Sequence, residues 1–289
     1  MLNLVRRISF NHATFGPDVS FKSFVEAVSQ SGAGGVGVWT ERLDGLTPQE
    51  AGKFIRNTGL EISGVNRGGF FTGASADERS AAVQHTKRQI EATAEMGGDT
   101  LVIVPGGLSG EVRLIGAARG YVADGVAAVA DFADAHGVRL AIEPFNPGLS
   151  AARGVINTLD SALELCEGFG SHVGVVTDVF HIWWDPNVYL AIERAGARVF
   201  GHHLCDWKLD TIDLSADRGV MGEGVGDADG LTAAILRTGY KGWMEIEIFS
   251  RNDLWTMEPA AIAALCLPRA LTCLQNAEQI NVGKRLANN

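Results

Sequence analysis

"VGVVTDVFHIWWD" (residues 173–185) begins as an apolar run and ends in an acid, a histidine and two tryptophans. The run is short and rich in valine, and it lacks the polar alternation of a half-exposed strand. It therefore predicts a strand buried on both faces. A plain strand end would finish in Gly, Asn or Pro, but here Asp178 ends the run and His181 follows three residues later. We expect this strand to deliver functional side chains at its carboxyl end.

Seven further apolar runs of this kind occur along the chain, and amphipathic stretches separate them. The predicted strands are 5–10, 35–39, 61–66, 100–105, 138–144, 173–178, 198–204 and 243–249. The clearest predicted helices are 77–96, 119–136, 158–168 and 228–238. Helix-capping signals stand at Thr47 before Pro48, and at Ser75 or Asp77.

Eight strands, each followed by a helix, predict an α/β fold, the (β/α)8 TIM barrel. No linker or charge block divides the chain, so we expect a single domain over 1–289, with a solvated C-terminal tail at about 278–289. A doubly wound open sheet is the structural alternative.

Composition excludes several classes of partner. A formal net charge of −10 argues against nucleic-acid binding, which usually needs a basic stripe. No apolar run reaches the ~20 residues of a membrane span, and the N-terminal segment lacks the apolar stretch of a signal peptide. The four cysteines, Cys166, Cys205, Cys266 and Cys273, have neither CxxC spacing nor the density of a disulfide framework. We therefore expect a cytoplasmic protein that does not bind a membrane.

The last four predicted strands all end in polar residues. These are Glu143 in "AIEP", Asp178 in "VVTD", His202, His203 and Asp206 in "GHHLCD", and Glu245 and Glu247 in "MEIEIF". Neighbours on a strand face opposite ways, so only one of His202 and His203 can point into the barrel. The same parity places Glu245 and Glu247 on one face, with Glu247 nearer the carboxyl rim, where barrel active sites lie.

Two carboxylates, an imidazole and a third carboxylate on adjacent strands are typical of a metal site. A lone Glu before Pro is more often a capping group, and a lone His beside an apolar run is more often a core residue. Trp183 and Trp184 could likewise be packing residues. Burying three carboxylates together without a cation would, however, be costly. Because no thiolate is present, the set suits Mn²⁺, Co²⁺, Mg²⁺ or Zn²⁺ and favours the harder ions.

The segments "AIEPFNP", "VTDVFHIWWDP", "HHLCDW", "DRGVMGEG" and "GYKGWMEIEIFS" together resemble the xylose-isomerase-like sugar phosphate isomerase/epimerase superfamily. The resemblance covers nearly the whole chain and implies a TIM barrel with one divalent ion, for which we expect Mn²⁺. The ligands it implies are Glu143, Asp178, His203 and Glu247, with Glu143 and Glu247 also carrying protons. It implies that His181, Arg218 and Glu223 surround the substrate, and we expect Trp183 and Trp184 to form an apolar wall against a sugar ring.

The second half also resembles the larger subunit of C-glycoside deglycosidases, in "HIWWDP" above all. Those proteins often carry a histidine in the turn after the strand-five Glu-Pro, where this chain has Asn146. We therefore expect Asn146 to bind the substrate, without the proton-transfer role of that histidine. Inosose dehydratases and isomerases are similar as well.

From these resemblances we expect a metal-dependent isomerase or epimerase of a keto sugar or polyol, or its phosphate, acting through an enediolate. A lyase, of the dehydratase or C-glycoside deglycosidase type, is the alternative, since both reactions begin by removing the same proton. The expected assembly is a homo-oligomer, or a hetero-oligomer with a small subunit for the deglycosidase type. An abasic-site endonuclease would need more histidines and a basic groove, and a binding protein without activity is a further possibility.

Overall fold

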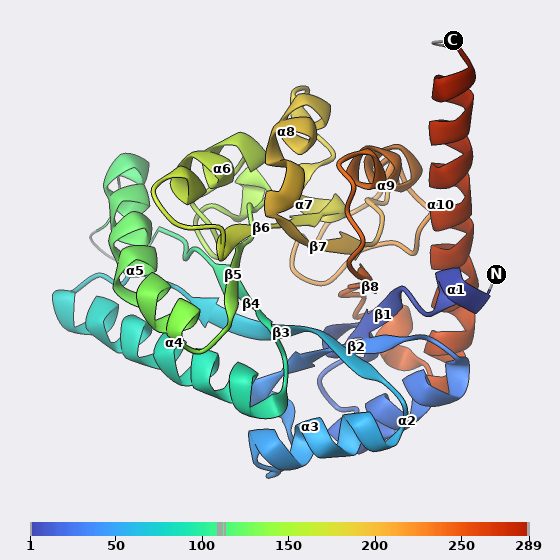
Figure 1. Ribbon diagram of the computed structural model, residues 1–289, viewed down its shortest axis with the longest axis horizontal. Coiled ribbons are helices and arrows are strands. Elements are labelled where there is room, and N and C mark those ends of the chain that lie inside the picture. The colour runs from blue at the N-terminus through green and yellow to red at the C-terminus, as the bar shows by residue number, and fades with distance from the viewer. Residues whose placement is uncertain (1, 109–111, 113, 288–289) are drawn as a thin grey trace.

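The computed structural model describes residues 2–108, 112 and 114–287, and within them eight parallel strands form a closed barrel (Figure 1). The strands are β1 (Ile8–Asn11), β2 (Gly35–Trp39), β3 (Glu61–Gly69), β4 (Thr100–Val104), β5 (Arg139–Ile142), β6 (Val173–Asp178), β7 (Val199–Leu204) and β8 (Met244–Ile246). Each strand pairs with the next in sequence, and β8 pairs with β1 through Met244 and Ile8. The predicted (β/α)8 barrel is confirmed, and this closure rules out the open-sheet alternative.

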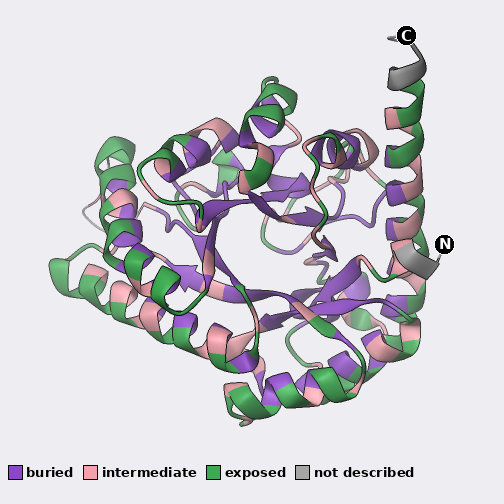
Figure 2. Cartoon of the chain, in the orientation of Figure 1, coloured by how far each residue is buried: buried purple, intermediate pink, exposed green. Residues whose placement is uncertain are grey.

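Helices surround the barrel on the outside, as Figure 1 shows. They are α1 (Leu2–Val5), α2 (Phe21–Ser31), α3 (Pro48–Asn57), α4 (Ala76–Met96), α5 (Ile115–Ala135), α6 (Leu159–Glu167), α7 (Val179–Ile182), α8 (Val188–Ala195), α9 (Ala228–Arg237) and α10 (Pro259–Ala287). Thr47 and Ser75 both cap their helices in capping boxes. Each side chain accepts the backbone N–H of the residue three positions later, Glu50 or Glu78, whose carboxylate accepts the backbone N–H of the capping residue. Figure 2 shows the strands almost wholly buried, whereas the helices expose their outer faces.

Strand ends differ from the predicted ones in two places that concern the rim. Strand β8 ends at Ile246, so Glu247 lies just past it, and Glu247 N–H still donates to the Leu204 carbonyl of β7 at 3.1 Å. Strand β3 runs to Gly69 rather than to the predicted position 66, which adds Arg67 to the strand. Its register against β4 shifts between Val65 and Gly68, an irregularity with no signal in the apolar pattern.

The segment expected as a solvated C-terminal tail is mostly exposed and is helical in its described part. Helix α10 continues to Ala287, and positions 288–289 lie outside the described residues. Asn281 fixes this part of the helix to α9, because its Nδ2 donates to the Ala233 carbonyl at 2.9 Å and its Oδ1 accepts from Arg237 at 3.0 Å. A polar sequence without an apolar stripe gave no signal for this docking.

Helix α10 is also, among the described residues, the one helix that could cross a membrane by length and composition, over Pro259–Gly283. This is weak support for a span, since core helices of soluble proteins pass the same test. In this structure α10 packs along α9 and α2.

Below the rim, apolar side chains fill part of the barrel interior. Val102, Ala141, Val176 and Phe200 form a separate buried cluster on four neighbouring strands. They share a small internal space with polar residues, among them His203 and Glu245.

Gly125 in α5 is a test of how tightly a helix packs on the barrel. A Cβ there would lie 2.2 Å from the Phe71 ring, whereas a Cβ on Gly120 of the same helix would meet nothing within 4 Å. We expect Gly125→Ala to lower the free energy of unfolding by about 1–3 kcal/mol through overpacking. Gly120→Ala should instead raise it, by up to about 1 kcal/mol, through better helix propensity. Urea denaturation measures both free energies of unfolding. An equal change in the two variants would show that the Phe71 ring moves aside without any loss of stability.

Candidate metal centre

Four adjacent strands bring the predicted ligands to one point at the carboxyl rim. Glu143 follows β5 directly, Asp178 is the last residue of β6, His203 lies on β7 and Glu247 follows β8. All four are buried, and each offers one ligand atom within 4.8 Å of the others. The convergence expected from the sequence is present.

The donor atoms of this cluster fit a cation. His203 Nδ1 lies 3.4 Å from Glu247 Oε2 and 3.8 Å from Glu143 Oε1. Both His203 Nδ1 and Glu143 Oε1 are buried and form no hydrogen bond within the described part of the chain. Leaving such atoms without a partner is costly. A divalent ion would satisfy both, and an oxygen-rich set with one nitrogen is the type that Mn²⁺ or Zn²⁺ accepts.

Crowding of these groups shows in their pKa values. Burial raises the pKa of Glu143 to about 8, and the charge of Glu247 adds to the effect. Burial would lower the pKa of His203, but the negative charges of Glu247, Glu245 and Glu143 raise it to about 10. Burial also opposes ionisation of Glu247, yet the charges of His203 and Arg218 bring its pKa to about 2. Without an ion, protons on Glu143 and His203 thus relieve the crowding of the carboxylates, and a bound cation would take the place of these protons.

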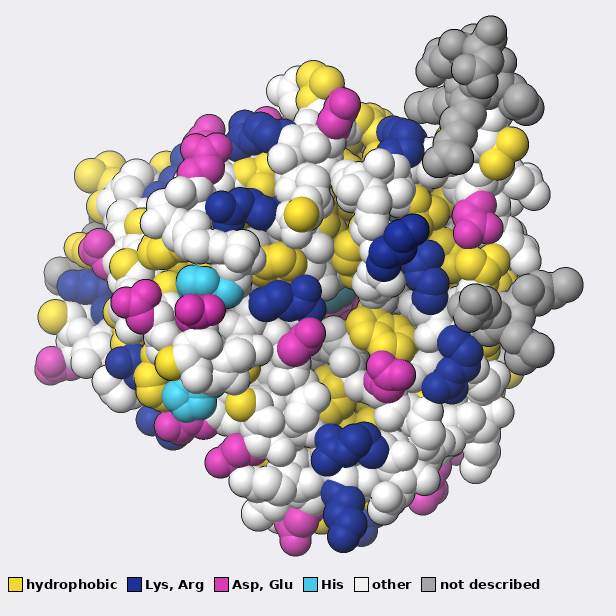
Figure 3. Space-filling view, viewed as in Figure 1, with side chains coloured by type: hydrophobic (Ala, Val, Ile, Leu, Met, Phe, Trp, Pro, Cys, Tyr) yellow, Lys and Arg dark blue, Asp and Glu magenta, His cyan; other side chains and the backbone are white. Residues whose placement is uncertain are grey.

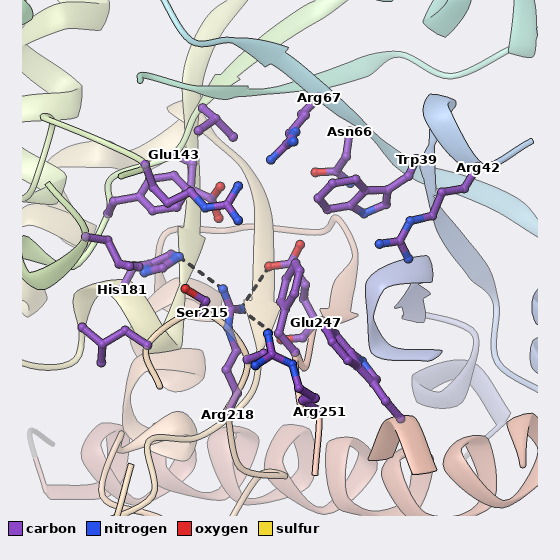
Figure 4. Close-up of a pocket in the computed structure, with 18 residues that line it drawn as sticks. Trp39, Arg42, Asn66, Arg67, Glu143, His181, Ser215, Arg218, Glu247 and Arg251 are labelled. Atoms are coloured by element: carbon purple, nitrogen blue, oxygen red, sulfur yellow. Dashed lines mark hydrogen bonds and ion pairs between the residues drawn. The ribbon is translucent and has the colours of Figure 1, made fainter. Parts of the chain in front are cut away.

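Arg218 holds two of the three carboxylate ligands in place. Its Nη1 donates to Asp178 Oδ2 at 2.7 Å and to Glu247 Oε2 at 3.1 Å, and Figure 4 shows its contact with Glu247. The guanidinium carbon lies 4.8 Å from the ring centroids of both Phe180 and Phe249, between which the group is buried. Arg218 therefore orients the cluster from within.

His181 lies beside Arg218, where its Nε2 is 3.2 Å from Arg218 Nη2. Its Nδ1 accepts the backbone N–H of Asn146 at 3.3 Å. Burial lowers the pKa of His181 to about 3, so the ring is neutral. A neutral imidazole at the cavity wall is a group that can hydrogen-bond a substrate hydroxyl.

Asn11, at the end of β1, is a site residue that the sequence reasoning missed. Its Nδ2 donates to Glu247 Oε1 at 3.0 Å and to Glu245 Oε1 at 2.7 Å, and its Oδ1 accepts from Trp39 Nε1 at 2.7 Å. Glu245 thus lies one layer below the rim, as strand parity predicted. A polar residue closing "ISFN" was the available signal.

His202 points away from the cluster, as the parity of neighbouring strand residues requires. Its Nδ1 lies 2.9 Å from Thr177 Oγ1 and its Nε2 lies 3.0 Å from Thr232 Oγ1. Both hydroxyls bond the ring outside the barrel interior. His203 is therefore the inward histidine of the pair.

Above the cluster lies a cavity of about 290 Å³ at the rim. Its lining includes Glu143, Glu247, His181 and Arg218, and Figure 4 shows these side chains directed into one space. Figure 3 shows one face of the molecule in the orientation of Figure 1, where Lys and Arg side chains stand among Asp and Glu side chains around the middle; the cavity itself is drawn in Figure 4. The aromatic residues of the lining are Trp39, Phe145, Phe249 and Trp255.

Four residues expected at the substrate do not line this cavity. Trp183 packs on Trp207, with ring centroids 5.4 Å apart. The Asn146 side chain accepts the Gly148 N–H at 2.9 Å and so caps a short turn. Glu223 is exposed and accepts the Val220 N–H at 3.0 Å. Trp184 also turns away, since its Nε1 donates to the His181 carbonyl at 2.8 Å. The apolar wall is built by other aromatic residues.

Comparison with known proteins agrees with this architecture. The family model described as "Xylose isomerase-like TIM barrel" matches residues 25–267. A curated relative, the 3-dehydroshikimate dehydratase of Pseudomonas aeruginosa, is 24% identical over 263 residues, which are 87% of this chain and 39% of that protein. This chain therefore spans about two fifths of the relative's length.

Solved structures share the fold. The crystal structure of protein SMc04130 from Sinorhizobium meliloti 1021 is 40% identical with a TM-score of 0.90, covering 93% of this chain and 98% of that one. A structure of IolI protein with a zinc atom is 18% identical, with a TM-score of 0.81 and coverage of 94% and 99%. An L-ribulose 3-epimerase is 20% identical, with a TM-score of 0.78 and coverage of 98% of both chains. The last two likenesses show the fold alone.

Proposed function

We propose a function on the premise that this chain belongs to the xylose isomerase-like TIM barrel family. The proposed function is that of a divalent-metal-dependent isomerase or epimerase, which acts through an enediolate on a keto sugar or polyol, or its phosphate. The observation that carries the proposal is the buried cluster of Glu143, Asp178, His203 and Glu247, two members of which line the rim cavity.

The ion would be held by those four residues, and we propose Mn²⁺, with Co²⁺, Mg²⁺ or Zn²⁺ also suited to the donors. The zinc atom in the IolI structure supports a divalent ion in this fold. When bound, the ion supplies Lewis acidity, which polarises a substrate carbonyl and so acidifies the adjacent C–H.

Glu143 and Glu247 would move the proton. They reach the cavity from β5 and β8, so they approach a bound substrate from different sides of the rim. Arg218 and Asn11 fix both oxygens of Glu247, whereas Glu143 Oε1 is free of hydrogen bonds in the described structure. One carboxylate can remove the proton and the other return it, as an isomerase or epimerase requires.

A dehydratase is the second candidate, favoured by the relative named 3-dehydroshikimate dehydratase. The same first proton leaves, and a hydroxyl β to the carbanion then departs as water. His181, neutral and at the cavity wall, is placed to contact such a hydroxyl.

The proposal extends to the protein's setting. We infer a cytoplasmic enzyme that acts on a small molecule, without nucleic acid or membrane, and that assembles as a homo-oligomer. A net charge of −10 supports the absence of a nucleic-acid partner.

Deuterium exchange tests the function through the step that both candidates share. We expect Mn²⁺-loaded protein in D₂O to place deuterium next to the carbonyl of at least one compound among 2-ketohexoses, inososes, 3-keto glycosides and 3-dehydroshikimate, as NMR would show. EDTA should stop the exchange, because the C–H is acidified only by the ion. A product with an inverted carbon or a moved carbonyl supports the isomerase, and release of water supports the dehydratase. Exchange into no compound would contradict both.

A further inference from the structure

Arginine dominates the charged lining of the rim cavity. Among the described residues five arginines line it, Arg42, Arg67, Arg153, Arg218 and Arg251, against two carboxylates, Glu143 and Glu247. Two of the five are paired. Arg218 binds Asp178 and Glu247, and Arg251 at the exposed rim lies 3.2 Å from Asp213.

The remaining three, Arg42, Arg67 and Arg153, form no ion pair with a carboxylate within the described part of the chain. Arg42 Nη1 donates to the Gly16 carbonyl at 3.1 Å, which leaves the rest of its guanidinium free to bond a ligand. Against the effect of burial, the negative charge of exposed Glu41 acts to raise the pKa of both Arg42 and Arg67. Within the described part of the chain, however, Glu41 forms an ion pair with neither arginine. Three cations therefore face one cavity without an ion-pair partner in the described part of the chain.

Aromatic rings fix the direction of Arg67. Its guanidinium carbon lies 5.0 Å from the Trp39 ring centroid and 4.8 Å from that of Phe70. Trp39 is itself held by its hydrogen bond to Asn11, and Asn11 in turn donates to Glu247 of the metal cluster. Figure 4 shows Arg67 and Glu143 pointing into the same space from neighbouring parts of the rim. An arginine held by stacking is preorganised, so little entropy is lost when it binds an anion.

Holding these cations together has a cost. Burial lowers the pKa of Arg67, and the positive charge of Arg153 lowers it further. Like charges in a partly buried place repel, and a fold that needed only packing there would be more stable with apolar groups. An anion in the cavity would remove this repulsion.

We propose that the substrate carries an oxyanion, a carboxylate or a phosphate, which Arg67 and Arg153 bind while the ketone faces Glu143 and Glu247. The ketone part rests on the proposed function, but the anion site does not. Arginine forks match both oxyanions with paired hydrogen bonds. A cavity of about 290 Å³ suits a compact molecule, such as one ring acid or a short sugar phosphate.

Matched ligands test the anion site without turnover. Calorimetry in a buffer free of phosphate would compare 3-dehydroshikimate with scyllo-inosose, both ring ketones, and D-fructose 6-phosphate with D-fructose. Both the Mn²⁺-loaded and the EDTA-treated protein would be titrated. We expect the anionic member of at least one pair to bind at least about tenfold more tightly, as charge-assisted hydrogen bonds predict. A preference in the first pair identifies a carboxylate, and one in the second a phosphate.

Variants tie that preference to the named residues. Arg67→Gln and Arg153→Gln should each weaken binding of the preferred anion about tenfold or more and leave the neutral partner unchanged. Arg67→Lys keeps the positive charge but loses the paired N–H donors of the guanidinium. Its affinity for the anion should therefore lie between those of the unaltered protein and Arg67→Gln. Arg194→Gln on α8, an exposed arginine paired with Asp160 at 2.9 Å, is the control and should bind as the unaltered protein does. Thermal unfolding checks that each variant is folded.

Two results would overturn the anion site. One is equal binding, or no binding, of both members in both pairs, and the other is an anion preference that survives both glutamine variants. Its failure differs from that of the proposed function. Deuterium exchange into neutral ketones without anion preference defeats the anion site alone, whereas arginine-dependent anion binding without any exchange defeats the proposed function alone.

Discussion

Replacing Glu247 by glutamine is expected to slow deuterium exchange into the substrate about a thousandfold, and excess Mn²⁺ should not restore it. Glutamine keeps the shape and one acceptor oxygen of the side chain, so one of the two hydrogen bonds from Arg218 and Asn11 is kept. It cannot accept a proton, and general acid–base groups contribute about 10²–10⁴ in rate. NMR exchange rates, measured over rising Mn²⁺ concentration with the bound metal determined in parallel, would show this loss.

Glu223→Gln is the matched control for this variant. Glu223 comes from the same half of the chain and was expected near the substrate, but it is exposed and outside the cavity lining. Its exchange rate should stay within about twofold, since changes at exposed sites are small. Complete recovery of Glu247→Gln at high Mn²⁺ would mean that Glu247 serves as a ligand only.

The barrel and its cluster could be predicted because both follow from local rules. Apolar runs identify the strands, and all parallel strands of a barrel end at one rim. The polar residues that end four successive strands must therefore converge there. Parity then allowed only one of His202 and His203 to face inward and placed Glu245 below Glu247, and the family resemblance indicated His203, as the structure shows.

The substrate side of the site follows no such rule. Trp183 lies two residues beyond His181, and on a helical turn such as α7 two residues differ by about 200° in direction. A ring placed there faces away from the side that His181 faces. The prediction that the two tryptophans form a wall beside the substrate did not take this difference in direction into account. Arg67 and Arg153 lie on segments far apart in the chain, and a single arginine has no periodic signal. Only the closed barrel brings them to one cavity.

Arg218 shows how the two parts of the site are coupled. It bonds Asp178 and Glu247 on the metal side, and it lies beside His181 on the substrate side. Its charge offsets part of the repulsion among the carboxylates and leaves their remaining oxygens for an ion. The sequence indicated Arg218 as a substrate contact, whereas the structure adds a role in positioning the ligands.

Loss of the His203 imidazole should weaken Mn²⁺ binding about a hundredfold or more. The unaltered protein should bind one divalent ion per chain, with His203 as the single nitrogen among four ligands. Its Nδ1 is buried without a hydrogen bond within the described residues and lies 3.4 Å from Glu247 Oε2, so it is placed to share an ion with that carboxylate. Changes in groups that only support a ligand already cost 10–100-fold in affinity, and His203→Ala removes the ligand itself.

His202→Ala is the control, because His202 is the next histidine on the same strand and is equally buried, yet bonds Thr177 and Thr232 outside the barrel interior. It should lower stability by removing two buried hydrogen bonds and leaving a cavity, but its Mn²⁺ affinity in calorimetry and its metal content should be those of the unaltered protein. Excess Mn²⁺ should restore part of the exchange activity of His203→Ala, in contrast to Glu247→Gln, because the proton carriers remain. Unchanged Mn²⁺ affinity in His203→Ala, or an unaltered protein that takes up none of Mn²⁺, Co²⁺, Mg²⁺ and Zn²⁺, would contradict a metal centre at this rim.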